Sequence, residues 1–133
     1  MNSQLIGKQK NMSRYEQDGK HYEPAVLVLT EDGMIQDCND AGEKLLGYRP
    51  GKMGRQHISG VLPRLSKINL FKGKRVNPYL RFLSRIGHPF EVIGNDSIRF
   101  SGELFFNNVE NAGGQRTVVM IHPVPVNQAK NLH

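Results

Sequence analysis

Five histidines and one cysteine are the residues of this chain best suited to metal binding or nucleophilic chemistry, but their spacing favours neither. No two of them have the C-x2-C or H-x3-H spacing with which a short segment presents two metal ligands. No Ser/His/Asp or Cys/His arrangement indicates a nucleophile beside its base. The glycine-rich segments also lack the spacing of phosphate-binding loops. The sequence therefore predicts no metal site and no enzyme.

Positive charge is concentrated in the middle of the chain. Between Arg49 and Arg85 there are ten Lys or Arg and no Asp or Glu, whereas the net charge of the whole chain is +6. Such a block can attract a small anionic ligand, an acidic protein face or nucleic acid, although charge runs most often simply face water. Few aromatic residues are interleaved with these charges and no nucleic-acid-binding motif is present, so nucleic-acid binding is the weakest of these interpretations.

A chain of 133 residues is normally one domain with a modest core. No apolar run approaches the roughly 20 residues that span a bilayer, and the first residues do not have the pattern of a secretory signal. A single cysteine, Cys38, fits a reducing compartment, so we expect a cytoplasmic protein without membrane insertion. We predict an N-terminal arm or cap helix at 1–23, a domain at 24–126 and a C-terminal tail or linker stub at 127–133.

The domain begins with the pattern of a β-hairpin. Residues 25–30 form an apolar run of strand-forming residues, and residues 34–38 are the returning strand. Asp32-Gly33 lies between them, and glycine tolerates the positive φ that a tight turn requires.

A short helix is predicted directly after this hairpin. Either Asn39 or Asp40 can cap it, and Glu43 follows Asp40 at the spacing of a capping box. Gly47 suits the left-handed position that ends a helix, and Pro50 prevents its continuation.

A second helix is predicted after the basic block. Asn77 can cap it, Pro78 fits its first position and Gly87 fits just past its end. Apolar residues recur at helical spacing, which predicts that one side faces the core. The expected core-facing residues are Tyr79, Phe82, Leu83 and Ile86.

Three more strands are predicted in the last third, at residues 88–93, 98–109 and 115–126. In the longest one, Ile98, Phe100, Leu104 and Phe106 are expected on one face, and Gly102 indicates a bulge or a close backbone approach. With the first hairpin this gives five strands. The fold class is therefore α+β, with one five-stranded antiparallel sheet and short helices packed on one face.

This order of elements resembles that of a PAS domain, and the resemblance covers roughly residues 24–124. It continues through residues 51–63, which are similar to the family's short middle helices, and residues 85–92, which are similar to the entry to its third strand. The matching residues at the start are Asp32-Gly33, Ile35, Asn39, Ala41, Leu45, Leu46 and Gly47-Tyr48. The resemblance implies a sensory or regulatory module of signal transduction.

In the PAS family, helices and sheet enclose a pocket that holds haem, flavin or a small metabolite in some members and nothing in others. The resemblance implies pocket candidates Arg55, His57, Tyr79, His88, Phe100 and His122. His57 stands where a LOV photosensor has its flavin-reactive cysteine, which argues against blue-light adduct chemistry. Arg55 could pair with flavin phosphates. The helix where family members carry a haem-ligating histidine has none here, which leaves His88 as the best candidate axial ligand.

The resemblance also implies partners. The exposed face of the sheet and the N-terminal arm are expected to form a homodimer or to bind an effector domain. Pro123 and Pro125 favour an extended exit from the last strand and disfavour direct helical transmission. The alternatives are a flavin- or haem-binding redox or gas sensor, a domain whose pocket is filled by its own side chains, and a basic nucleic-acid-binding protein.

Overall fold

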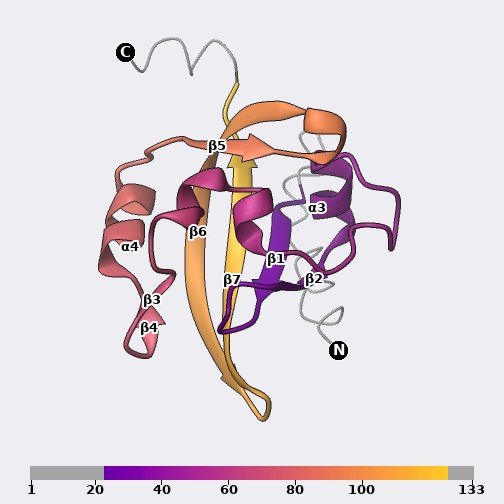
Figure 1. The fold of residues 1–133 in the computed structure, drawn as a ribbon. Helices are drawn as coiled ribbons and strands as arrows, with labels where there is room; N and C mark the ends of the chain where they lie inside the picture. The colour runs from indigo at the N-terminus through magenta and orange to yellow at the C-terminus, as the bar shows by residue number, and fades with distance from the viewer. Residues whose placement is uncertain (1–22, 126–133) are drawn as a thin grey trace.

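The computed structural model describes residues 23–125, so most of the predicted N-terminal arm at 1–23 and the whole tail at 127–133 lie outside it. One antiparallel sheet has the strand order β2-β1-β7-β6-β5 (Figure 1). Its strands are β1 (Ala25–Leu29), β2 (Ile35–Cys38), β5 (Phe90–Ile93), β6 (Arg99–Asn111) and β7 (Gly114–Pro123). The five strands predicted from the sequence are thus confirmed.

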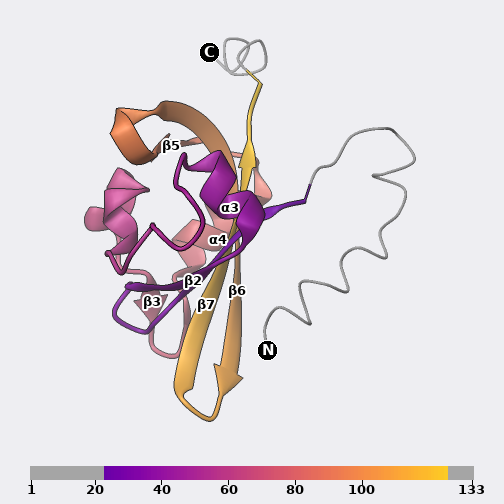
Figure 2. The same ribbon diagram turned by 90° about the vertical axis from the view of Figure 1, so that its right-hand side faces the viewer.

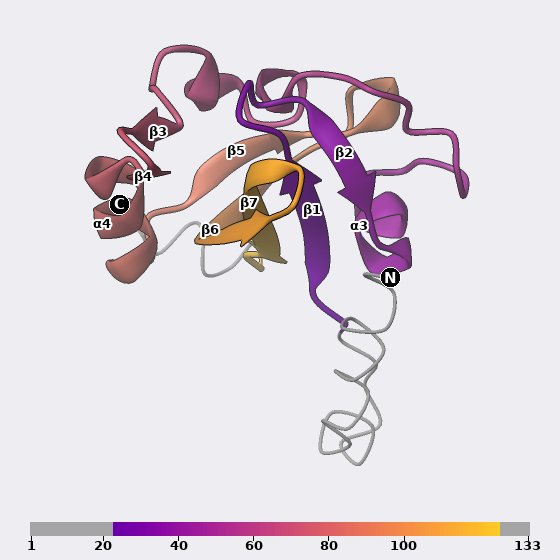
Figure 3. The ribbon, with the colours of Figure 1, turned by 90° about the horizontal axis from the view of Figure 1, so that it is seen from below.

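The helices and a small hairpin lie on one face of this sheet, as the sequence predicts (Figure 2). These elements are α3 (Asp40–Leu45), η2 (Ile58–Gly60), η3 (Pro63–Ser66), β3 (Phe71–Lys72), β4 (Arg75–Val76), α4 (Pro78–Arg85) and η4 (Asn95–Ser97). Seen from below, α3 lies towards β2, whereas α4 and the β3–β4 hairpin lie beyond β6 at the other end of the sheet (Figure 3). Within residues 23–125, no helix is long and apolar enough to cross a membrane.

The core lies between the inner face of the sheet and these helices. Every second residue of β1 is buried, as expected for a strand with one face in the core. The inner-facing side chains of the strands form one core cluster with buried residues of η2, η3 and α4. The fully buried side chains include Leu27, Leu29, Leu46, Ile58, Leu62, Leu80, Phe90, Leu104 and Ile121.

Asn39 caps α3 and at the same time ties it to β1. Its Oδ1 atom accepts hydrogen bonds from the backbone N–H groups of Gly42 (2.8 Å) and Val26 (2.9 Å). The predicted capping box between Asp40 and Glu43 is wrong, because Asp40 is already inside the helix and Glu43 accepts a hydrogen bond from a later loop instead. The cap lies one residue earlier, where its side chain serves both elements.

Helix α4 has the predicted ends but not the predicted orientation. Of the expected core-facing residues, only Leu83 is buried. The other buried side chain of the helix is Leu80, which was not among them. Tyr79, Phe82 and Ile86 are 46%, 48% and 56% exposed. The physical reason is that Leu83 has apolar neighbours on both flanks, and a periodic pattern does not say which flank meets the sheet. The Leu80 flank packs in the core, and the Phe82 flank faces solvent.

Gly102 marks a close approach and not a bulge. Gly102 pairs with Phe90 of β5 and with Pro123 of β7, and neither ladder has a register shift there. A Cβ atom there would lie 3.1 Å from Ile121 Cγ2 and 3.3 Å from Val92 Cγ2. Ile98 precedes the strand and is 45% exposed, so it does not join Leu104 on the inner face as predicted.

Candidate functional site

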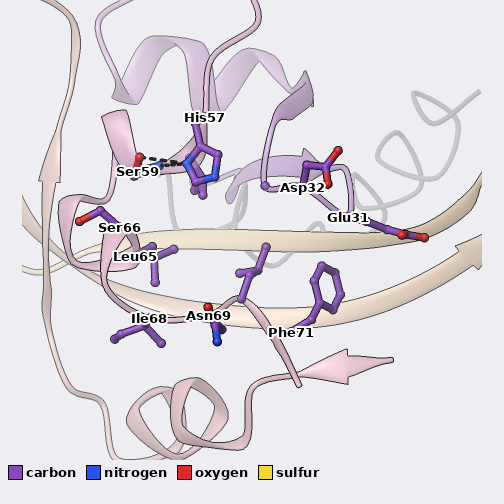
Figure 4. Close-up of a pocket in the computed structure, with 12 residues that line it drawn as sticks. Glu31, Asp32, His57, Ser59, Leu65, Ser66, Ile68, Asn69 and Phe71 are labelled. Carbon is purple, nitrogen blue, oxygen red and sulfur yellow. Dashed lines mark hydrogen bonds between the residues drawn. The ribbon is translucent and has the colours of Figure 1, made fainter. Parts of the chain in front are cut away.

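A surface depression of about 470 Å³ lies where the β1–β2 turn, η2 and the segment before β3 meet (Figure 4). Each segment supplies a different chemistry. The turn contributes carboxylates, η2 contributes an imidazole and a hydroxyl, and the third segment contributes mainly apolar side chains. The lining residues are Glu31, Asp32, Gly33, His57, Ile58, Ser59, Leu65, Ser66, Ile68, Asn69, Leu70 and Phe71.

Contacts at both ring nitrogens hold the His57 side chain in place. Its Nδ1 atom accepts a hydrogen bond from the backbone N–H of Ser59 (3.1 Å), so the imidazole caps η2, and Nδ1 also lies 2.9 Å from the Ser59 hydroxyl. Its Nε2 atom packs against Gly33, where an added Cβ would lie only 2.6 Å away. Gly33 has a φ of +84°, which glycine adopts without strain. Its lack of a side chain also leaves room for the His57 ring. The imidazole therefore joins η2 to the first hairpin.

The depression does not have the geometry of a hydrolytic site. A Ser-His-Asp triad needs a carboxylate on one ring nitrogen and the nucleophile on the other. Here the serine contacts Nδ1, and among residues 23–125 no carboxylate bonds to His57. Glu31 instead accepts a hydrogen bond from the backbone of Gln115 (3.1 Å). The arrangement can bind a ligand that offers hydrogen-bond donors to the carboxylates and an apolar group to Leu70 and Phe71.

A second depression, of about 220 Å³, lies between β2 and the loop that carries Arg55. Cys38 lines it, and its thiol donates a weak hydrogen bond to the Asn39 carbonyl (3.5 Å). Burial, and then the nearby carboxylates of Glu43, Asp37 and Asp40, raise the pKa of the Cys38 thiol to about 12. Cys38 is therefore a neutral thiol with little nucleophilic character at neutral pH.

Two of the six predicted pocket residues are brought together by a residue that sequence reasoning missed. Arg64 of η3 donates to the Tyr79 hydroxyl (3.2 Å), and its Nη1 atom lies 2.8 Å from His88 Nε2. Its guanidinium carbon also lies 5.8 Å from the centre of the Phe90 ring. Arg64 is one of ten cations in the basic block, and nothing in the local sequence distinguishes it from the others.

The other four candidates lie apart. His57 and Arg55 line the two separate depressions. Phe100 is partly buried and packs against the core, whereas His122 is exposed on β7. The structure thus distributes the six residues over several places and does not gather them around one cavity.

The inner face of the sheet does not fit a haem or flavin ring as it is packed. Leu27, Leu62 and Leu104 have no exposed surface, so a ring placed between sheet and helices would displace several such side chains. His88 would have to release Arg64 before its Nε2 atom could ligate iron. Within residues 23–125, no group of three His, Cys, Asp or Glu side chains is arranged to hold a metal ion.

The comparison with family models finds no match, and the comparison with curated proteins finds none at a significant level. Solved structures do resemble this one. The PAS domain of an HTR-like protein from Haloarcula marismortui has a TM-score of 0.59 at 16% identity, over 87% of this chain and 99% of that chain. A PAS domain from a two-component sensor histidine kinase has a TM-score of 0.58 at 8% identity, over 88% and 99%.

A third similar structure is the PAS domain of nitrogen regulation protein NR(II) from Vibrio parahaemolyticus. Its TM-score is 0.52 at 14% identity, over 76% of this chain and 89% of that chain. In all three cases the likeness extends over most of both chains. The chain has the fold of PAS domains, as the resemblance in its sequence predicts.

Proposed function

We propose that this chain is a sensory and regulatory module of signal transduction that acts by associating with a second copy of itself. Two kinds of observation support the proposal. The fold is that of PAS domains, one of them from a two-component sensor histidine kinase. The outer face of the sheet carries an apolar row that no described element covers. This row is the observation on which the proposal chiefly depends.

The row crosses three strands in register. Met120 on β7 pairs with Val26 on one side and with Phe105 on the other. All three point away from the core because their neighbours along each strand are buried. Phe105 and Met120 are 43% and 36% exposed. Aromatic residues and methionine are enriched at protein interfaces, and an exposed apolar patch on a sheet indicates a partner.

The charges beside the row suit two copies related by a twofold axis. Arg116 and Glu103 alternate with buried residues and so share the outer face, near opposite ends of the β6–β7 ladder. A twofold axis through Met120 would bring Arg116 of one copy towards Glu103 of the other. Such a face is self-complementary, as a homodimer requires.

The test is the mass of the protein in solution, measured by sedimentation equilibrium over a range of concentrations. The wild-type chain is expected to form a dimer, and Phe105→Glu and Met120→Glu are expected to be monomeric with unchanged circular dichroism. Ile98→Glu is the matched control, because Ile98 is equally exposed but lies outside the row. A wild-type chain that is monomeric at every concentration would overturn the proposal.

Small-ligand binding at the depression of Figure 4 is the second candidate function. It is supported by the combination of Glu31 and Asp32 with the apolar side chains of Leu70 and Phe71. The carboxylates favour an amine or another hydrogen-bond donor, so the anionic ligand expected from the basic block would need a different site. Titration with small amines, followed by the backbone amide chemical shifts, tests this candidate. The amides of the residues that line the depression are expected to shift, and changes confined to other residues would contradict it.

A cytoplasmic location is part of the proposal and rests on the single cysteine, which is a free thiol. Flavin or haem sensing is the remaining alternative. A UV-visible spectrum of the purified protein, before and after addition of each cofactor, distinguishes it from the self-associating module. A cofactor band that persists after gel filtration would favour the cofactor sensor.

A further inference from the structure

Helix α4 presents a stripe of large apolar side chains to solvent. Successive helical residues are rotated by about 100°, so Tyr79, Phe82 and Ile86 fall within about 60° of one another. Each is about half exposed. The helix cannot turn this stripe inwards, because Leu80 and Leu83 already anchor its other side in the core. We call these three side chains the α4 stripe.

Three arginines border the α4 stripe. Arg85 of the same helix lies about 60° round the helix from Phe82, on the side away from Leu83, and Arg81 lies about 40° further round. Arg64 reaches the other end of the stripe, where it donates to the Tyr79 hydroxyl (3.2 Å). Its contacts with His88 and the Phe90 ring hold its guanidinium in a defined position. An arginine fixed in this way loses less entropy when it binds a further group.

None of these arginines has an acidic partner within the part of the chain that the structure describes. The ion pair present there joins Arg99 and Glu91, which lie outside the basic block. One carboxylate, that of Glu103, approaches the C-terminal end of α4, where its Oε2 atom lies 3.4 Å from the position of a Cβ on Gly87. The stripe is thus apolar at its centre, with Arg64 at its Tyr79 end and Arg85 beside Phe82.

We propose that the α4 stripe docks an acidic amphipathic helix of a partner protein. Apolar anchors of that helix would pack on Tyr79, Phe82 and Ile86. Its carboxylates would accept hydrogen bonds from Arg64, Arg81 and Arg85, where arginine can bind bidentately. Helices commonly bind in this way through anchors at i, i+3, i+4 and i+7.

The shape of the surface favours a protein over a membrane or a nucleic acid. A helix that binds at a membrane surface turns a broad apolar face to the lipid, whereas Leu80 and Leu83 of α4 are buried in the domain. Binding to single-stranded nucleic acid relies on aromatic faces for stacking. Ile86 is the most exposed member of the stripe and has no such face.

This inference goes beyond self-association and concerns a different element. The apolar row of the proposed dimer lies on β1, β6 and β7, whereas the stripe lies on α4. The Phe105→Glu variant designed to disrupt the dimer should therefore still bind the partner helix. If the wild-type chain dimerises but does not bind the helix, only the docking proposal has failed. If it binds the helix but stays monomeric, only the dimer proposal has failed.

The probe is a designed amphipathic helix of roughly four turns with leucine anchors on one side and glutamate elsewhere. Two control peptides accompany it, one with lysine in place of glutamate and one with alanine in place of leucine. Binding of each to the full chain is measured by fluorescence anisotropy, and amide chemical shifts locate the contact. The acidic peptide is expected to bind at least about tenfold more tightly than either control, with shifts centred on α4.

Two variants test the two halves of the surface. Phe82→Ser with Ile86→Ser removes the anchors, and Arg81→Glu with Arg85→Glu reverses the charge. Both pairs are exposed, so unfolding midpoints should change little, and each pair should weaken binding by about tenfold or more. Ile98→Ser is the matched control and should bind like the wild type. Equal binding of all three peptides, undiminished binding by both variants, or binding of duplex DNA or phosphatidylserine vesicles in place of the peptide would overturn the proposal.

Discussion

Asn108 on β6 and Thr117 on β7 face each other across the strand ladder, and each buries one side-chain oxygen that has no hydrogen-bond partner among the described residues. The Asn108 amide donates instead to the carbonyl of Lys74 in the β3–β4 hairpin (3.1 Å). Thr117 has no exposed surface and is the single buried polar side chain of the described core. The two residues form a polar spot on the inner face of the sheet beneath that hairpin.

Thr117→Val is expected to stabilise the protein by about 1 kcal/mol, because it replaces a buried hydroxyl that lacks a partner with a methyl group of similar size. Urea unfolding measures the change. Thr30→Val is the matched control. The Thr30 hydroxyl accepts a hydrogen bond from the Met34 backbone N–H (3.2 Å), so removing this hydroxyl should destabilise the protein. Destabilisation by both substitutions to a similar degree would show that the Thr117 hydroxyl does have a partner.

Asn39→Ala is expected to lower the free energy of unfolding by about 2–3 kcal/mol. The substitution removes the cap of α3, the hydrogen bond to Val26 and the donation from Nδ2 to the Pro24 carbonyl (2.8 Å). Asn39→Asp keeps the accepting oxygen but replaces the donating Nδ2 with an acceptor beside the Pro24 carbonyl, so it should destabilise less than alanine does. If aspartate proved as damaging as alanine in urea unfolding, the cap would not be the main contribution of this side chain.

Cys38 is expected to react slowly with iodoacetamide. Its pKa of about 12 leaves very little thiolate at neutral pH, and the thiolate is the reactive form. Alkylation of the folded chain near neutral pH should be at least about tenfold slower than alkylation in urea. Because the pKa is raised, the folded rate should keep increasing with pH after the rate in urea has levelled off. Parallel pH profiles in the two states would contradict the assigned environment.

Gly94→Ala is expected to destabilise strongly. A Cβ at this position would lie 2.6 Å from the Leu46 carbonyl oxygen, and that carbonyl is held by a hydrogen bond from Asn95 N–H (2.7 Å). Crowding of this kind costs about 1–3 kcal/mol. Gly54→Ala is the comparison, because it has a φ of +70° but no atom within 4 Å and should cost about 1–2 kcal/mol from backbone strain alone. A thermal melt that ranked Gly54→Ala as the worse variant would show that the Leu46 backbone can move aside.

The parts of the fold that sequence predicted well are those decided by neighbouring residues. The turn at Asp32-Gly33, the cap at Asn77 and the end of α4 at Gly87 each depend on local backbone preferences. For α3, the sequence offers two capping residues, Asn39 and Asp40. Asn39 is the cap, and its side chain also bonds to Val26, thirteen residues away, which the local sequence does not reveal. Local patterns thus located the elements but not every contact between them.

The candidate site was less predictable because it depends on how elements pack. The rotation of α4 is set by the burial of Leu80, and the expected stripe was consistent with either flank of Leu83 facing inwards. Arg64 contacts Tyr79 and His88 across 15 and 24 residues of sequence. No periodicity or motif joins such positions, so the grouping appears only once η3, α4 and β5 are placed together.

The β6–β7 hairpin extends well beyond its neighbours, and its tip projects from the body of the molecule (Figure 1). The ladder continues to the pair Asn111 and Gly114, whereas β1 accompanies β7 only from Thr117 to Ile121. Backbone amides near the tip should therefore exchange with deuterium soon after transfer to heavy water. Those beside Leu104 and Ile121 should exchange only when the whole domain opens. One continuous hairpin should thus contain backbone amides that open at very different rates.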